Sequence, residues 1–81
     1  MEKVWILKIG GFYDCNPQVR VFSDFYKASE CLESEYARFK SENPEFLERF
    51  NSKYSKILRK PKSENGNYDG FVFSINDYEV Q

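Results

Sequence analysis

The chain has 81 residues, a formal net charge of −1 and no histidine; 41% of its residues are hydrophobic and 19% are aromatic. A chain this short buries only about 60 to 65% of its unfolded surface, so we expect a single domain over residues 1–81 with one core. The apolar content argues against disorder, and the missing histidine excludes Ser-His and Cys-His nucleophiles.

The charges are segregated along the chain. Residues 1–48 carry nine acids and six bases, residues 49–62 carry six bases and no acid, and residues 63–81 carry four acids and no base. The overall charge therefore argues against generic polyanion binding, which is typical of basic domains. Only the basic segment 49–62 keeps nucleic acid open as a partner.

The first predicted elements are two strands. Residues 3–9 are apolar at both odd and even positions, which is typical of a strand in the interior of a sheet. Turn-forming residues follow, and residues 19–22 alternate again between apolar and polar. We expect an antiparallel hairpin, because strands close in sequence usually pair in this way.

A helix is predicted from Phe25. Its apolar side chains recur at spacings of three and four residues. They are Phe25, Ala28, Leu32, Tyr36 and Phe39. Ser23 is the expected N-cap, with Asp24 at the positive end of the helix dipole.

A second helix is predicted to begin at Pro44, with Asn43 as its N-cap and residues 59–62 at its end. Its apolar stripe would be Phe46, Phe50, Tyr54, Ile57 and Leu58. Residues 63–70 have the composition of a loop, and residues 71–81 form the last strand. A change of apolar parity in that strand predicts a bulge near Asn76 and Asp77.

Together these elements predict an α+β fold of order β-β-α-α-β. Its sheet would have three antiparallel strands in the order 2-1-3, with both helices packed on one face. One apolar face of the first strand would then lack a covering layer, which favours a homodimer contact or a partner surface. The alternative is that a loop or the second helix folds over this face.

Little in the sequence indicates catalysis. The acids that share a helical face, such as Glu30 and Glu33, are more typical of a solvated surface than of an acid–base pair. The cysteines, Cys15 and Cys31, have no further soft ligands beside them, and we expect free thiols. The sequence thus predicts no enzyme, no metal site and no cofactor.

The basic segment contains the clearest candidate binding residues. Arg49, Lys53, Lys56 and Lys60 would form one stripe on the second helix, and Arg59 would extend it. Such a stripe suits an acidic protein surface or phosphates, unless the helix dipole or acids of the same chain neutralise it. Phe12 and Tyr13, at the tip of the hairpin loop, would either contact a partner or pack back onto the domain.

Three stretches carry a family resemblance: VWILKI, VRVFSDFYKA and FVFSINDYEVQ. They resemble a group of small, mostly uncharacterised phage and bacterial β-β-α-β proteins, whose short forms would lack the helix predicted after Pro44. The resemblance implies no catalytic residue. It implies a phage accessory protein that binds a host enzyme or defence complex and inhibits or redirects it.

The sequence and this resemblance together predict a non-catalytic cytoplasmic protein, of the host cytoplasm if phage-encoded, that binds a host protein stoichiometrically. The predicted contact residues are Phe12, Tyr13, Arg49, Lys53, Lys56, Arg59 and Lys60. Charge reversal at Lys53 and Lys56 is expected to weaken binding without changing the melting temperature. The alternative is nucleic-acid binding through the same stripe, with Tyr54 or Tyr68 stacking on bases. No apolar run is long enough for a membrane span.

Overall fold

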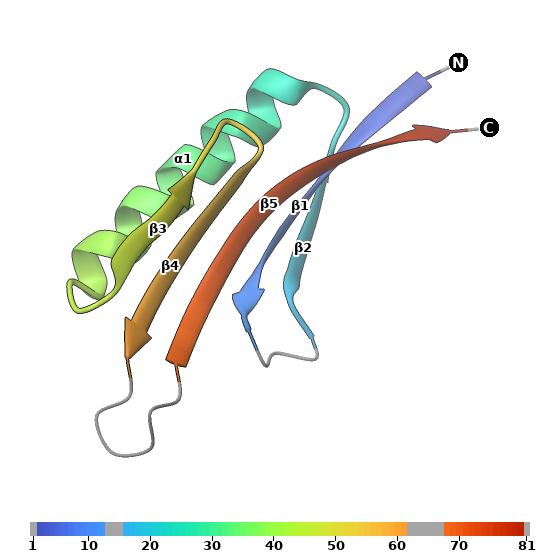
Figure 1. Cartoon of the computed structure of the whole chain (residues 1–81). Helices are drawn as coiled ribbons and strands as arrows, with labels where there is room; N and C mark the ends of the chain where they lie inside the picture. The colour runs from blue at the N-terminus through green and yellow to red at the C-terminus, as the bar shows by residue number, and fades with distance from the viewer. Residues whose placement is uncertain (1, 13–15, 62–67, 81) are drawn as a thin grey trace.

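The computed structural model describes residues 2–12, 16–61 and 68–80. It contains one helix and five strands, arranged as a sheet with the helix against one side (Figure 1). The elements are β1 (Glu2–Gly11), β2 (Gln18–Phe22), α1 (Phe25–Glu42), β3 (Leu47–Asn51), β4 (Ser55–Pro61) and β5 (Tyr68–Val80).

The strands form one antiparallel sheet in the order β2-β1-β5-β4-β3. The predicted hairpin of β1 and β2 is present, and the last strand pairs on the other side of β1 as expected. The predicted three-stranded sheet with two helices is nevertheless wrong. Its error lies between Pro44 and Pro61, where two further strands, β3 and β4, extend the sheet.

Helix α1 begins at Phe25, as its apolar spacing predicts, but the capping residues differ from the prediction. Asp24 is the N-cap and its carboxylate accepts a hydrogen bond from the Tyr26 amide at 2.7 Å. Asn43 is the C-cap of this helix, and its backbone and side-chain N–H groups both donate to the Phe39 carbonyl. Asn43 therefore ends one helix instead of starting another.

The predicted second helix is a β-hairpin. Ser52 closes the turn between β3 and β4, where its hydroxyl accepts from the amides of Tyr54 and Ser55. The apolar residues that matched a helical spacing belong to two different strands. Each strand has its own alternation of apolar and polar residues, and β3 has a bulge between Glu48 and Phe50. Short apolar runs of this kind fit both the helical and the strand period, so the available pairing partners decide which structure forms.

The bulge predicted near Asn76 and Asp77 is wrong as well. The register of β1 and β5 runs without a break from Glu2 opposite Val80 to Gly11 opposite Phe71. The change of apolar parity marks instead the point where β5 extends beyond its contact with β4, which ends at Ser74. Beyond that point the strand no longer has one buried and one exposed side.

The core lies between α1 and the sheet. Helix residues Ala28, Leu32 and Tyr36 are buried, as the predicted stripe requires. The sheet contributes Leu7, Ile9, Leu58, Phe73 and Ile75. A ring cluster around Phe39, Phe71 and Phe73 closes one end of this layer, because aromatic side chains cover a large area per residue.

Candidate functional site

The side of the sheet opposite α1 is the largest candidate surface. Arg20 of β2 and Lys56 of β4 contact the helix, at Cys31 and Glu33, so the residues that alternate with them in the strands face away from it. No helix or strand among the described residues covers that side (Figure 1). We call it the open face.

The open face is rich in apolar side chains. Its apolar strand residues are Val4, Ile6, Val19, Val21, Leu47, Phe50, Ile57, Val72, Tyr78 and Val80. Nine large hydrophobic side chains of the described residues are exposed, and seven of them lie on this face once Phe12 is included. The strongest cases are Val21, which is 61% exposed, and Leu47, which is 56% exposed. An exposed apolar surface of this extent marks an interaction site more often than a solvated one.

Polar residues divide the open face into two apolar areas. Lys8, Ser74 and Ser55 lie in register across the three central strands and form a polar band. On one side of the band, Val72 lies opposite Ile57, and Ile57 lies opposite Phe50. On the other side, β1 and β2 contribute aliphatic side chains and β5 contributes Tyr78 and Val80. Apolar areas with polar residues between them resemble a protein interface that contains some hydrogen bonds.

Phe12, one of the predicted contact residues, lies against the open face. Its amide donates to the Gly70 carbonyl at 2.9 Å, and its ring occupies the space where a Cβ of residue 70 would lie. The guanidinium of Arg59 lies over the same ring, 5.7 Å from its centroid. Phe12 therefore packs back onto the sheet while it remains 39% exposed. Tyr13 lies outside the described residues.

The predicted basic stripe does not form, because its residues belong to two strands and a turn. Arg49 lies in β3 and Lys53 in the turn after it, and both are exposed. Arg59 lies on the open face. Lys60 and Lys56 lie on the opposite side of the sheet, with the Lys60 ammonium 5.2 Å from the ring centroid of Phe46.

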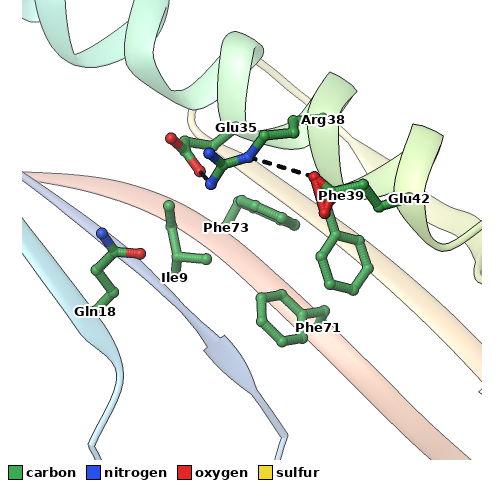
Figure 2. A pocket seen from close by; sticks show the side chains of 8 residues that line it. All are labelled: Ile9, Gln18, Glu35, Arg38, Phe39, Glu42, Phe71 and Phe73. Carbon is green, nitrogen blue, oxygen red and sulfur yellow. Dashed lines mark hydrogen bonds and ion pairs between the residues drawn. The ribbon is translucent and has the colours of Figure 1, made fainter.

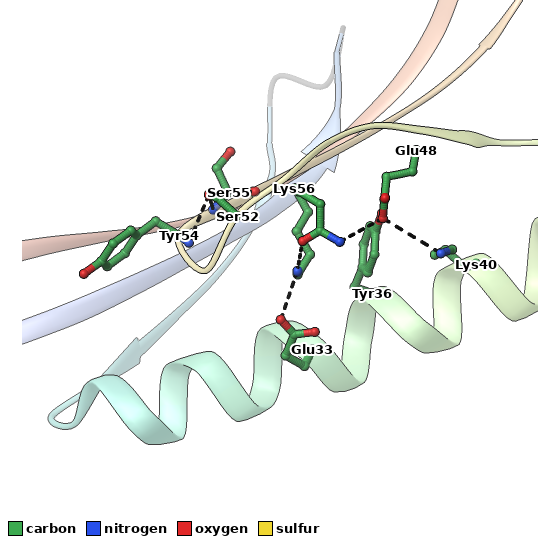
Figure 3. A network of polar contacts seen from close by, with 9 residues as sticks. Glu33, Tyr36, Lys40, Glu48, Ser52, Tyr54, Ser55 and Lys56 are labelled. Carbon is green, nitrogen blue, oxygen red and sulfur yellow. Dashed lines mark hydrogen bonds and ion pairs between the residues drawn. The ribbon is translucent and has the colours of Figure 1, made fainter.

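Lys56 is a buried residue of the helix–sheet layer, with only 3% of its surface exposed (Figure 3). Its ammonium lies 2.9 Å from a carboxylate oxygen of Glu33, donates to the side chain of Asn51 and lies 5.0 Å from the ring centroid of Tyr36. An amphipathic lysine buries its methylene chain and satisfies its charge at the tip in this way. Lys56 therefore holds the helix–sheet layer together and presents little surface to a partner.

A second polar contact joins α1 to β3 beside Lys56. The Tyr36 hydroxyl and the Asn51 side chain both donate to the carboxylate of Glu48, and the Lys40 ammonium lies 3.9 Å from it (Figure 3). The hydrogen bond from Tyr36 is the main cause that lowers the pKa of Glu48, and burial raises the pKa of Tyr36. These shifts keep both groups in the forms that hold the helix to the edge of the sheet.

A small cavity lies between α1 and the sheet, with a volume of about 140 Å³ (Figure 2). Its apolar side includes Ile9, Phe39, Phe71 and Phe73. At its rim, Arg38 pairs with Glu35 and lies 3.9 Å from a carboxylate oxygen of Glu42. Gln18 also lines the cavity, and the rim charges already pair with one another.

Other kinds of site find no support in the part of the chain that the structure describes. No group of three His, Cys, Asp or Glu residues there could hold a metal ion. The Cys31 thiol is free and accepts a hydrogen bond from Arg20 at 3.2 Å. Among the described residues, no helix is both long and apolar enough to span a bilayer.

Comparison with known proteins returned no family model, no curated protein and no solved structure that matches this chain. The resemblance to small phage and bacterial proteins therefore stays a prediction. The candidate surface rests on this chain alone.

The sequence prediction of an uncovered apolar sheet face agrees with the structure, but most residues of the face were not identified. Val19 and Val21 alternate with Gln18 and Arg20, which was a readable signal. Leu47 and Phe50 were assigned to a helix, so their place on the sheet went unrecognised. The bases predicted as contact residues are divided between the two sides of the sheet.

Proposed function

We propose that this protein acts without catalysis, by stoichiometric contact between its open face and another protein chain. The observation that carries the proposal is that, of the nine large hydrophobic side chains exposed among the described residues, seven gather on one sheet face. Inhibition or modulation of a host protein, which the resemblance implies, is a role of this kind.

The chemistry of the open face favours protein over nucleic acid. Single strands bind where cations follow the backbone and aromatic rings stack on bases, and the open face offers mainly valine, isoleucine and leucine. Lys8 and Arg59 are the cations at its regular positions and Arg49 lies in the β3 bulge, so these bases are spread over three strands. Moving aliphatic side chains out of water and onto another apolar surface lowers the free energy, which favours binding.

The test is capture of a partner from a lysate of a plausible host, with the open face as the variable. The variant Val21→Lys/Leu47→Lys places two charges on the open face at positions exposed enough to leave the fold intact. We expect it to lose at least about 90% of the partner that the unmodified protein captures, because a buried unpaired charge costs several kcal/mol.

The matched control is Tyr26→Lys/Ser34→Lys, which adds the same charge to exposed positions of α1. We expect this control to capture the partner at the unmodified level. Equal capture by both variants would show that the open face is not the contact surface. Shift assays with labelled DNA and RNA at low salt test the nucleic-acid alternative, for which a shift abolished by Arg49→Glu/Lys53→Glu, at two exposed bases of the predicted stripe, would be decisive.

A further inference from the structure

We infer that the open face is occupied by a second copy of this chain, so that the free protein is a dimer with two sheets packed face to face. The inference rests on the proposed function, since both concern the same face. It adds that, before any other partner binds, the chain on the open face is a second copy. Three observations favour a second copy: the size of the face, its side-chain types and its charge.

The size of the open face matches what a stable dimer buries. The five strands comprise 40 residues. With strands about 4.8 Å apart and about 3.4 Å per residue, they cover roughly 650 Å² before the relief of the side chains adds to the area. Stable interfaces bury about 600 to 1,000 Å² on each partner, a range that includes this value. A copy that covered most of the face would therefore bury a sufficient area.

The side chains of the face are those of a sheet core. Val, Ile and Leu predominate, whereas interfaces between separately stable proteins are enriched in Tyr, Trp, Arg and Met. The face thus resembles the inner side of a β-sandwich, where two sheets of like twist pack about 10 Å apart. Two copies of one sheet have the same twist, which satisfies that requirement.

The charge of the face permits self-association. Glu2, Lys8 and Arg59 are the charged residues at its regular positions, and Arg49 lies in the β3 bulge, so the face carries few charges and both signs are present. Glu2 lies near one end of β1, and Lys8 and Arg59 lie toward the other. A face of one strong sign would repel its own copy, and the acids of α1 lie on the opposite side of the sheet.

The direct test is the molar mass of the full chain in solution, measured by sedimentation equilibrium from micromolar to near-millimolar concentration. We expect twice the 9.7 kDa of one chain. Val21→Lys/Leu47→Lys should raise the dissociation constant at least about 100-fold, because each substitution enters the symmetric contact twice. Tyr26→Lys/Ser34→Lys should leave it unchanged. Circular dichroism and thermal unfolding of both variants establish that each is folded.

Each outcome decides the inference separately from the function. A monomer at every concentration overturns the dimer, while the proposed function stands if partner capture still depends on the open face. A dimer that survives Val21→Lys/Leu47→Lys also overturns it and places self-association on another surface of the chain. A dimer that only the open-face variant dissociates supports the inference whether or not a further partner is captured.

Discussion

At the scale of single residues, Lys56 shows how far a charge can be from the role that sequence spacing suggests. In the predicted basic stripe it looks like a contact for an acidic partner. In the structure its ammonium lies in the helix–sheet layer, beside Glu33 and the ring of Tyr36. The side of the sheet on which a lysine lies depends on the pairing register of its strand. A shift of that register by one residue moves the lysine to the other side.

This position changes the expected effect of charge reversal. Lys56→Asp places a carboxylate in a buried site beside Glu33, and we expect it to lower the free energy of unfolding by at least about 3 kcal/mol. Lys56→Met fills the same space and leaves Glu33, whose side chain is 56% exposed, to solvent. It should cost less than about 1.5 kcal/mol. Urea denaturation followed by circular dichroism measures both, and equal small effects would contradict the buried assignment.

Lys53 provides the contrast, because it lies in the exposed turn between β3 and β4. Its charge reversal should change the free energy of unfolding by less than about 0.5 kcal/mol. The sequence prediction that both reversals leave stability unchanged therefore holds only for the residue that the turn exposes.

At the scale of elements, the contact between Phe12 and Gly70 ties the end of β1 to the start of β5. A Cβ at position 70 would lie 2.1 Å from the Phe12 ring, which no side chain tolerates without displacement. Any larger residue at position 70 must therefore displace the ring. The ring belongs to the residue that follows β1, so it is free to swing away when residue 70 grows.

We expect Gly70→Ala to lower the free energy of unfolding by about 1 to 3 kcal/mol, because it displaces the Phe12 ring from the sheet. In a Phe12→Ala background the same change should cost less than about 0.5 kcal/mol, since the obstacle is gone. A double-mutant cycle by urea denaturation measures the difference. Equal costs in both backgrounds would mean that the ring does not determine the need for glycine.

The β3–β4 hairpin is the element that sequence reasoning missed. Phe46, Phe50 and Tyr54 recur at every fourth residue, and Pro44 follows a good capping residue. Both are typical of helices. The turn at Ser52 was the opposing signal, but serine is common in helices too. What decides the structure is that the free edge of β5 can pair with β4, which only the assembled sheet provides.

At the scale of the whole molecule, the chain is elongated, with dimensions of 50, 23 and 17 Å. Its length comes from the ends of β1 and β5, which project beyond the other strands (Figure 1). Residues 2–4 and 78–80 pair only with each other. A two-stranded ribbon is marginally stable in water by itself, so this projection is the weakest part of the sheet.

We expect the hydrogen-bonded amides of this projection to exchange with solvent at least about 100-fold faster than those of Leu7 and Ile9 in a monomeric sample. The monomeric variant Val21→Lys/Leu47→Lys and NMR-detected hydrogen exchange give this comparison. Uniform protection along β1 and β5 in that variant would show that the projection needs no further support. Extra protection in the unmodified protein would place the projection within the dimer contact.

The amino-acid sequence by itself determined the local features of this protein. These are the apolar strand of residues 3–9, the hairpin after it, the helix from Phe25, and the absence of histidine chemistry, because each depends on near neighbours or on composition. Tertiary structure decided the rest. Residues 44–61 became strands because β5 offered a pairing edge, the strand register divided the bases between two sides, and one helix could cover only one side of five strands. The open face follows from that last fact, since a two-layer fold leaves the second side of its sheet to solvent or to another chain.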